Sequence, residues 1–65
     1  MNKMIKLDQF LKLVGIAATG GQAKLMIVDG EVKVNGTVET RRGKKLEPTD
    51  QVTVNGQIFK VGDVI

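Results

Sequence analysis

The feature that most constrains the fold is a change of hydrophobic period at Gly30. Before this glycine, apolar residues recur with the spacing of an α-helix. After it, Val32 and Val34 alternate with polar neighbours, which is typical of a strand with one buried face. Glycine commonly ends a helix in the left-handed conformation. The chain is therefore predicted to divide into a helical first half and a β-rich second half.

Two short helices are predicted before Gly30. The first places an apolar stripe on one face at i, i+3, i+4 and i+7 and ends at Gly15; the stripe is Leu7, Phe10, Leu11 and Val14. The second begins at Thr19, whose hydroxyl can cap the amide of Gln22 while the glutamine reaches back, as in a capping box. Its inward stripe is Ala23, Met26 and Ile27, and we expect Leu25 and Val28 to widen it, so that much of this helix is buried.

The second half contains two similar hairpins, each with an Asn-Gly turn, at Asn35-Gly36 and Asn55-Gly56. For the first, a two-residue loop would pair Val34 with Thr37 and leave Val38 on the outer face. A three-residue loop with a bulge would instead pair Val34 with Val38, and we favour it because it turns Val38 inward. The fold class is therefore α+β, with two short helices packed on a small, mostly antiparallel sheet of about four strands.

Length and composition limit the function. With 65 residues and no cysteine, the chain is predicted to form one domain, 1–65, held by packing alone. It has no membrane-length apolar run and no recognisable leader, so we expect a soluble, cytoplasmic protein that binds no membrane. Histidine, cysteine, serine, tyrosine and tryptophan are all absent. No enzymatic activity, metal or cofactor is therefore expected.

One segment concentrates positive charge. Residues 41–45 hold four of the ten basic residues and no acid: Arg41, Arg42, Lys44 and Lys45. Arginine guanidinium groups can fork onto phosphate oxygens, whereas lysines act as mobile point charges. Lys24 and Lys33 are expected to share a face with this basic segment. The two phenylalanines lie among apolar residues, so base stacking is not expected.

Gly20 and Gly21 lie in the first turn of the second predicted helix, where glycine lowers helix stability. Two explanations remain open. The glycines relieve a crowded turn, or their missing side chains let a phosphate approach the exposed amides at the positive end of the helix.

The chain resembles the S4 domain, an RNA-binding module, over nearly its whole length. The resemblance is closest to the stand-alone bacterial branch, the YaaA/YbcJ-like proteins. It is carried by Lys6-Leu7-Asp8-Gln9-Phe10-Leu11, by Gln22-Ala23-Lys24 with Met26-Ile27, by Gly30-Glu31-Val32-Lys33-Val34-Asn35-Gly36, and by Glu39 to Leu46.

The resemblance implies an αL motif, in which two helices and the following hairpin bind structured RNA. By position it assigns RNA contacts to Lys6, to the helix start, to Lys33 and to Asn35. The helix start comprises Thr19, Gly20, Gly21, Gln22 and Lys24. Many S4 domains have Ser-Arg where this chain has Thr19-Gly20. We infer that the basic segment replaces the missing arginine.

These observations predict a non-catalytic, monomeric protein that binds ribosomal or transfer RNA, in association with the ribosome, through backbone and shape contacts. The alternative is a protein-interaction module on a ribosomal or RNA-processing complex. DNA remains a candidate ligand, because phosphate contacts do not distinguish the two sugars. A ubiquitin-like sulfur carrier is disfavoured, because the chain ends Gly62-Asp63-Val64-Ile65 and not in Gly-Gly.

Overall fold

Both predicted helices are present in the computed structural model, which describes residues 4–65. Helix α1 spans Leu7–Leu13 and buries Leu7, Phe10 and Leu11 of its predicted stripe. Val14 follows the helix as its C-cap and is partly buried, and the chain continues through Gly15 with a φ of 81°. Helix α2 spans Gly20–Val28. As predicted, Thr19 caps it, because the amide of Gln22 donates to Thr19 Oγ1 at 3.1 Å. The Gln22 side chain reaches one residue further back than a capping box requires and accepts from the amide of Ala18 at 2.8 Å.

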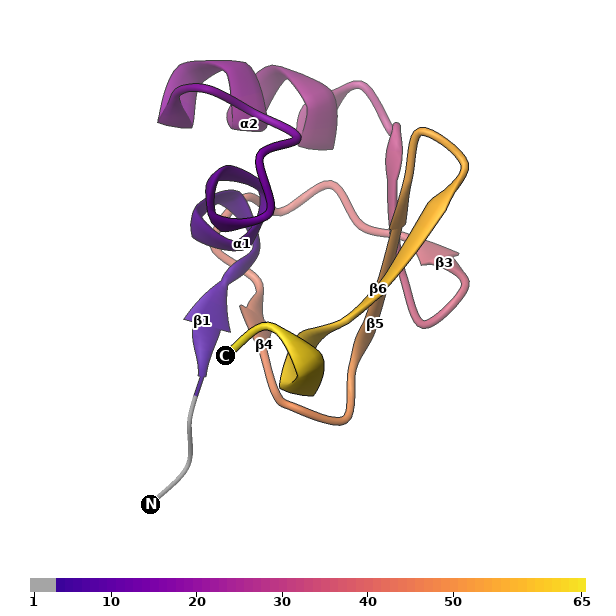
Figure 1. Ribbon diagram of the computed structural model, residues 1–65. Coiled ribbons are helices and arrows are strands. Elements are labelled where there is room, and N and C mark those ends of the chain that lie inside the picture. The colour runs from indigo at the N-terminus through magenta and orange to yellow at the C-terminus, as the bar shows by residue number, and fades with distance from the viewer. Residues whose placement is uncertain (1–3) are drawn as a thin grey trace.

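The strands form two antiparallel sheets, which confirms the α+β class. The larger sheet has the order β3-β2-β5-β6. Its strands are β2 (Val32–Val34), β3 (Thr37–Val38), β5 (Gln51–Val54) and β6 (Gln57–Lys60), followed by the short 3₁₀ helix η1 (Val61–Asp63). The smaller sheet pairs β1 (Ile5–Lys6) with β4 (Lys45–Leu46). Figure 1 shows the helices to one side of the larger sheet, with β1 leading directly into α1.

The core lies between the helices and the inner face of the larger sheet. The side chains of Val32, Val34, Val52 and Val54 all point to this face, since they are directly paired across β2 and β5. Phe10 of α1 meets Phe59 of β6 edge to face, with ring centroids 6.3 Å apart. Helix α2 adds Ala23 and Ile27, and β4 adds Leu46, which is fully buried. No helix within residues 4–65 is long and apolar enough to cross a membrane.

The predicted burial of α2 was wrong for two residues. Leu25 is 64% exposed and Val28 is 55% exposed. The buried side of the helix is formed by Ala23 and Ile27, with Met26 partly buried beside them. Because no further layer covers the opposite side of α2 in residues 4–65, apolar side chains there remain in solvent.

The predicted register of the first hairpin was also wrong. Val34 pairs with Thr37, and Val38 lies opposite Lys33 on the outer face, where it is 48% exposed. The loop is the two-residue Asn35-Gly36 turn, with φ angles of 52° and 84°. Two left-handed residues give a hairpin turn whose twist matches that of the strands. Turn geometry therefore prevailed over the burial of one more valine.

Candidate nucleic-acid interface

The basic segment is fixed to the start of α1 by backbone hydrogen bonds. Lys6 precedes α1 and provides no side-chain cap. Instead, the amide of Leu7 donates to the carbonyl of Lys44 at 2.8 Å, and the amide of Asp8 donates to the carbonyl of Arg42 at 3.2 Å. The first amides of a helix lack partners within it, so these loop carbonyls satisfy them. The basic segment is thus held in place by the helix it caps.

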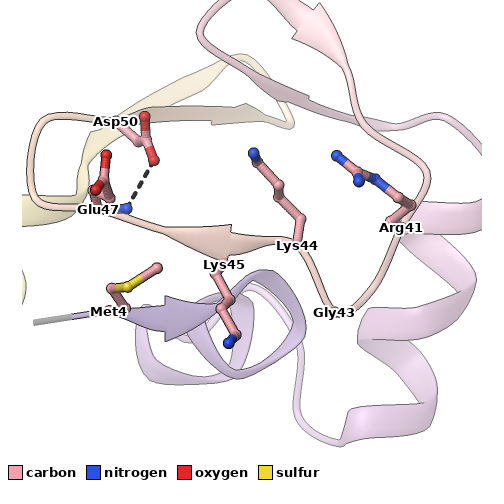
Figure 2. Close-up of a pocket in the computed structure, with 7 residues that line it drawn as sticks. All are labelled: Met4, Arg41, Gly43, Lys44, Lys45, Glu47 and Asp50. Carbon is pink, nitrogen blue, oxygen red and sulfur yellow. Dashed lines mark hydrogen bonds between the residues drawn. The ribbon is translucent and has the colours of Figure 1, made fainter.

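Lys44 and Lys45 extend from opposite sides of the chain around β4 (Figure 2). Lys44 is partly buried and points into an open depression of about 590 Å³. The residues that line this depression are Met4, Arg41, Gly43, Lys44, Lys45, Glu47 and Asp50. Lys45 is exposed and lies directly opposite Lys6 in the register of β1 and β4. The structure therefore brings the predicted residues Lys6 and Lys45 together.

Arg42 forms an ion pair with Asp8 of α1. Its Nη2 and Nε donate to Asp8 Oδ2 at 3.0 and 3.2 Å. The Asp8 side chain is only 7% exposed, whereas that of Arg42 is 47% exposed. The same guanidinium lies beside the start of α2, since a Cβ added to Gly20 would be 3.7 Å from Arg42 Nη2. The helix start and the basic segment, far apart in sequence, thus lie next to each other at Arg42.

Arg41 forms a second ion pair, with Glu39. Its Nε and Nη2 donate to the two carboxylate oxygens at 3.0 and 3.1 Å, and its backbone amide donates to the same side chain at 3.1 Å. The side-chain hydrogen bonds of Arg41, followed by its backbone hydrogen bond, lower the pKa of Glu39 from 4.5 to about 2. The pKa of Arg41 is raised by the same contact.

Sequence reasoning missed both carboxylates. The basic segment contains no acid, yet the fold places Glu39 and Asp8 against its two arginines. Glu39 is two residues from Arg41, so its spacing was a usable signal. Asp8 is 34 residues from Arg42, and only the tertiary structure brings them together. The positive charge of the segment is therefore partly neutralised, and Lys44 and Lys45 make no ion pair within the described residues.

The start of α2 is open. Thr19, Gly21, Gln22 and Lys24 are exposed, and Gly20 is partly buried. A Cβ added to Gly21 would meet nothing closer than Thr19 Oγ1 at 3.9 Å, and one added to Gly20 would also make only ordinary contact. Neither glycine has a positive φ. A crowded turn therefore does not explain these two glycines.

The side chain of Asn35 forms hydrogen bonds within the fold. Its Nδ2 donates to Asp50 Oδ1 at 2.9 Å, and its Oδ1 accepts from the amide of Gln51 at 2.9 Å. This ties the first hairpin turn to the loop before β5. The pKa of Asp50 is lowered, first by the hydrogen bond from the Glu47 amide and then by that from Asn35.

Lys33 is an exposed residue of strand β2. It occupies the outer face of the larger sheet, between Val38 and Thr53 in the register. Within residues 4–65, no group of three or more carboxylates, histidines or cysteines is placed to hold a metal ion.

Together, the fold and this surface define a small α+β domain with an exposed basic segment docked on two helix starts. The family model described as "S4 domain" matches residues 1–62, so the chain belongs to the S4 domain family.

Two relatives from bacteria are similar over most of the chain. The chain is 44% identical over 54 residues to the "Probable ribosome maturation protein RlbA" of Bacillus subtilis strain 168, covering 83% of this chain and 76% of that protein. It is 40% identical over 57 residues to the "Putative RNA-binding protein YbcJ" of Escherichia coli strain K12, covering 88% and 81% of the two chains.

A solved structure is also similar. The trimeric structure of Vibrio cholerae Heat Shock Protein 15 matches with a TM-score of 0.73 and 25% identity over 85% of this chain. The chain spans only 55% of that protein, about half of its length.

Proposed function

We propose that this S4-domain protein binds structured RNA, of the ribosomal or transfer class, without catalysing a reaction. The single observation that carries the proposal is the exposed basic segment, fixed by backbone hydrogen bonds against α1 and lying beside the start of α2. Such an arrangement suits a phosphate backbone. The names of the Bacillus and Escherichia relatives, which refer to ribosome maturation and RNA binding, support this choice of ligand.

The proposed contacts fall into a central group and a peripheral group. The central group surrounds the basic segment: Lys6, Arg41, Arg42, Lys44 and Lys45, with Thr19, Gly20, Gly21, Gln22 and Lys24 at the adjacent helix start. Lys33 and Asn35 are peripheral, since Lys33 lies on the outer sheet face and the Asn35 amide is already bonded to Asp50 and Gln51. We propose that the protein acts as a cytoplasmic monomer in association with the ribosome, as one RNA-binding domain over residues 1–65.

The proposal is tested by replacing the four basic side chains together. We expect the variant Arg41→Ala/Arg42→Ala/Lys44→Ala/Lys45→Ala to bind a folded transfer RNA or ribosomal RNA fragment more weakly. The dependence of log Kd on log salt should flatten by up to about one unit for each phosphate group that the variant no longer binds. The control is Lys12→Ala/Lys60→Ala, which removes exposed charge from α1 and β6.

Unchanged affinity in the fourfold variant would contradict the proposal. Pull-down from cells before and after RNase treatment separates RNA binding from a protein-interaction role. Competition between duplex DNA and folded RNA at matched salt identifies the preferred nucleic acid. Light scattering in solution tests the monomer.

A further inference from the structure

Arg42 is held by one edge of its guanidinium group only. The Nε and Nη2 groups both donate to the same oxygen of Asp8. The two hydrogen bonds of the Arg42 side chain within residues 4–65 come from Nε and Nη2, and none comes from Nη1. A guanidinium group is planar and carries donors along more than one edge. The edge of Arg42 that includes Nη1 is therefore available, and nearly half of the side chain is exposed, at 47%.

Asp8 is itself firmly fixed. Its Oδ1 accepts from the amide of Gln9 at 2.8 Å, and its own amide donates to the carbonyl of Arg42 at 3.2 Å. Its side chain is buried, with 7% exposed. Asp8 and Arg42 are thus joined by both backbone and side chain. If Arg42 turned away, the buried Asp8 carboxylate would lose its charged partner, which is costly, so the pair is expected to persist when a ligand arrives.

We propose that Asp8 is a positioning residue for RNA, which holds one edge of the Arg42 guanidinium so that the other edge faces a phosphate group. This inference rests on the proposed function. A forked interaction with phosphate needs a defined guanidinium orientation. A long side chain that is already ordered loses less conformational entropy on binding. Arg41 differs, because its partner is two residues away in sequence and its side chain is 71% exposed.

The sign of a mutational effect distinguishes positioning from simple charge. Any carboxylate near a polyanion site opposes binding, so its removal should strengthen RNA binding if charge alone matters. If the carboxylate positions Arg42, its removal should instead weaken RNA binding. In Asp8→Asn, the amide nitrogen must face either the Gln9 amide or the Arg42 guanidinium, because Asp8 Oδ1 and Oδ2 both accept hydrogen bonds. The variant therefore cannot hold Arg42 in the same way.

The experiment measures the Kd of a folded transfer RNA at fixed salt for wild type, Asp8→Asn and Glu47→Gln. Glu47 is the matched control, because it is exposed, lines the depression beside the basic segment and carries the same charge. We expect Asp8→Asn to weaken binding about three- to tenfold, the scale of ordering one long side chain. Glu47→Gln should leave affinity unchanged or raise it. Thermal melting establishes that both variants are folded.

The variant Arg42→Lys tests the same inference while leaving Asp8 intact. It keeps the charge but removes the forked donor group, so we expect a loss of RNA affinity similar to that of Asp8→Asn. The double variant Asp8→Asn/Arg42→Lys should bind RNA little more weakly than either single variant. The inference is overturned if folded Asp8→Asn binds RNA as tightly as wild type or more tightly. It is also overturned if the affinity losses of the two single variants add in full in the double variant. Should Asp8→Asn not fold, an unchanged affinity in Arg42→Lys overturns it. The fourfold alanine variant tests the proposed function separately, because its affinity does not depend on how Arg42 is held.

Discussion

Lys6 and Lys45 lie directly opposite each other on the antiparallel strands β1 and β4. Both side chains are exposed, while their neighbours Ile5 and Leu46 are partly and fully buried. Like charges that face each other across a strand pair are destabilising. Because one lysine of this pair belongs to the basic segment, a pair that opposes folding is consistent with a role in binding.

Neutralising Lys45 is therefore expected to affect folding and binding in opposite directions. Lys45→Gln should raise the free energy of unfolding by about 0.2–1 kcal/mol, because it relieves repulsion with Lys6. The same variant should bind folded RNA more weakly. Urea unfolding and an RNA titration measure the two effects. Lys60→Gln is the control, since Lys60 faces the uncharged Gln51 and should give no gain in stability. A loss of stability in Lys45→Gln would refute the argument.

Gly21 allows a comparison between size and charge at the start of α2. A Cβ at this position has room, so Gly21→Ala should keep or raise stability, by up to about 1 kcal/mol. Gly21→Glu should also fold, because a carboxylate is favourable in the first turn of a helix. It should nevertheless impair RNA binding more than it impairs folding. Melting curves and RNA-binding curves of Gly21→Glu provide the test. Equal losses of stability and of RNA affinity would indicate that the role of Gly21 is purely structural.

Asn35 and Asn55 form a matched pair for measuring the link between the first hairpin turn and the loop before β5. Both lie in two-residue turns with almost the same φ, 52° and 53°. Only Asn35 bonds to Asp50 and Gln51 through its side chain. Asn35→Ala should therefore lower the free energy of unfolding by about 1 kcal/mol more than Asn55→Ala. Chemical denaturation of both variants checks this, and equal losses would show that the hydrogen bonds add nothing.

The ion pair between Glu39 and Arg41 should make the stability of the protein depend on pH. The pKa of Glu39 is lowered on folding from 4.5 to about 2, so the folded state binds fewer protons in this range. The contribution of Glu39 is thus present above about pH 4.5 and lost as the pH falls toward 2. We expect Glu39→Gln to melt at a lower temperature than wild type at pH 6, with the difference vanishing near pH 2.

The pH effect should be small and sensitive to salt. Arg41 is 71% exposed, and solvent and ions screen such pairs. In 1 M salt the melting difference between wild type and Glu39→Gln should shrink at pH 6. A difference that grows toward pH 2 would have the wrong sign for a lowered pKa.

Features that depend on neighbours along the chain could be predicted from the sequence. The apolar spacing of Leu7, Phe10 and Leu11 predicted α1, and Thr19 predicted the start of α2. The alternation around Val32 predicted a strand. In each case the signal and the structure it specifies lie within a few residues, because helix caps and the strand period are local. The fold class followed from these elements.

Which side chains meet and which face solvent depended instead on how the elements pack. Leu25 and Val28 of α2 are exposed because no further layer covers them within residues 4–65. The pairing of Asp8 with Arg42, 34 residues away, depends on the docking of the basic segment on α1. A count of charges in a segment cannot reveal a carboxylate that arrives from another element. The sequence therefore located the positive charge, and the fold decided how much of it remains free and how it is oriented.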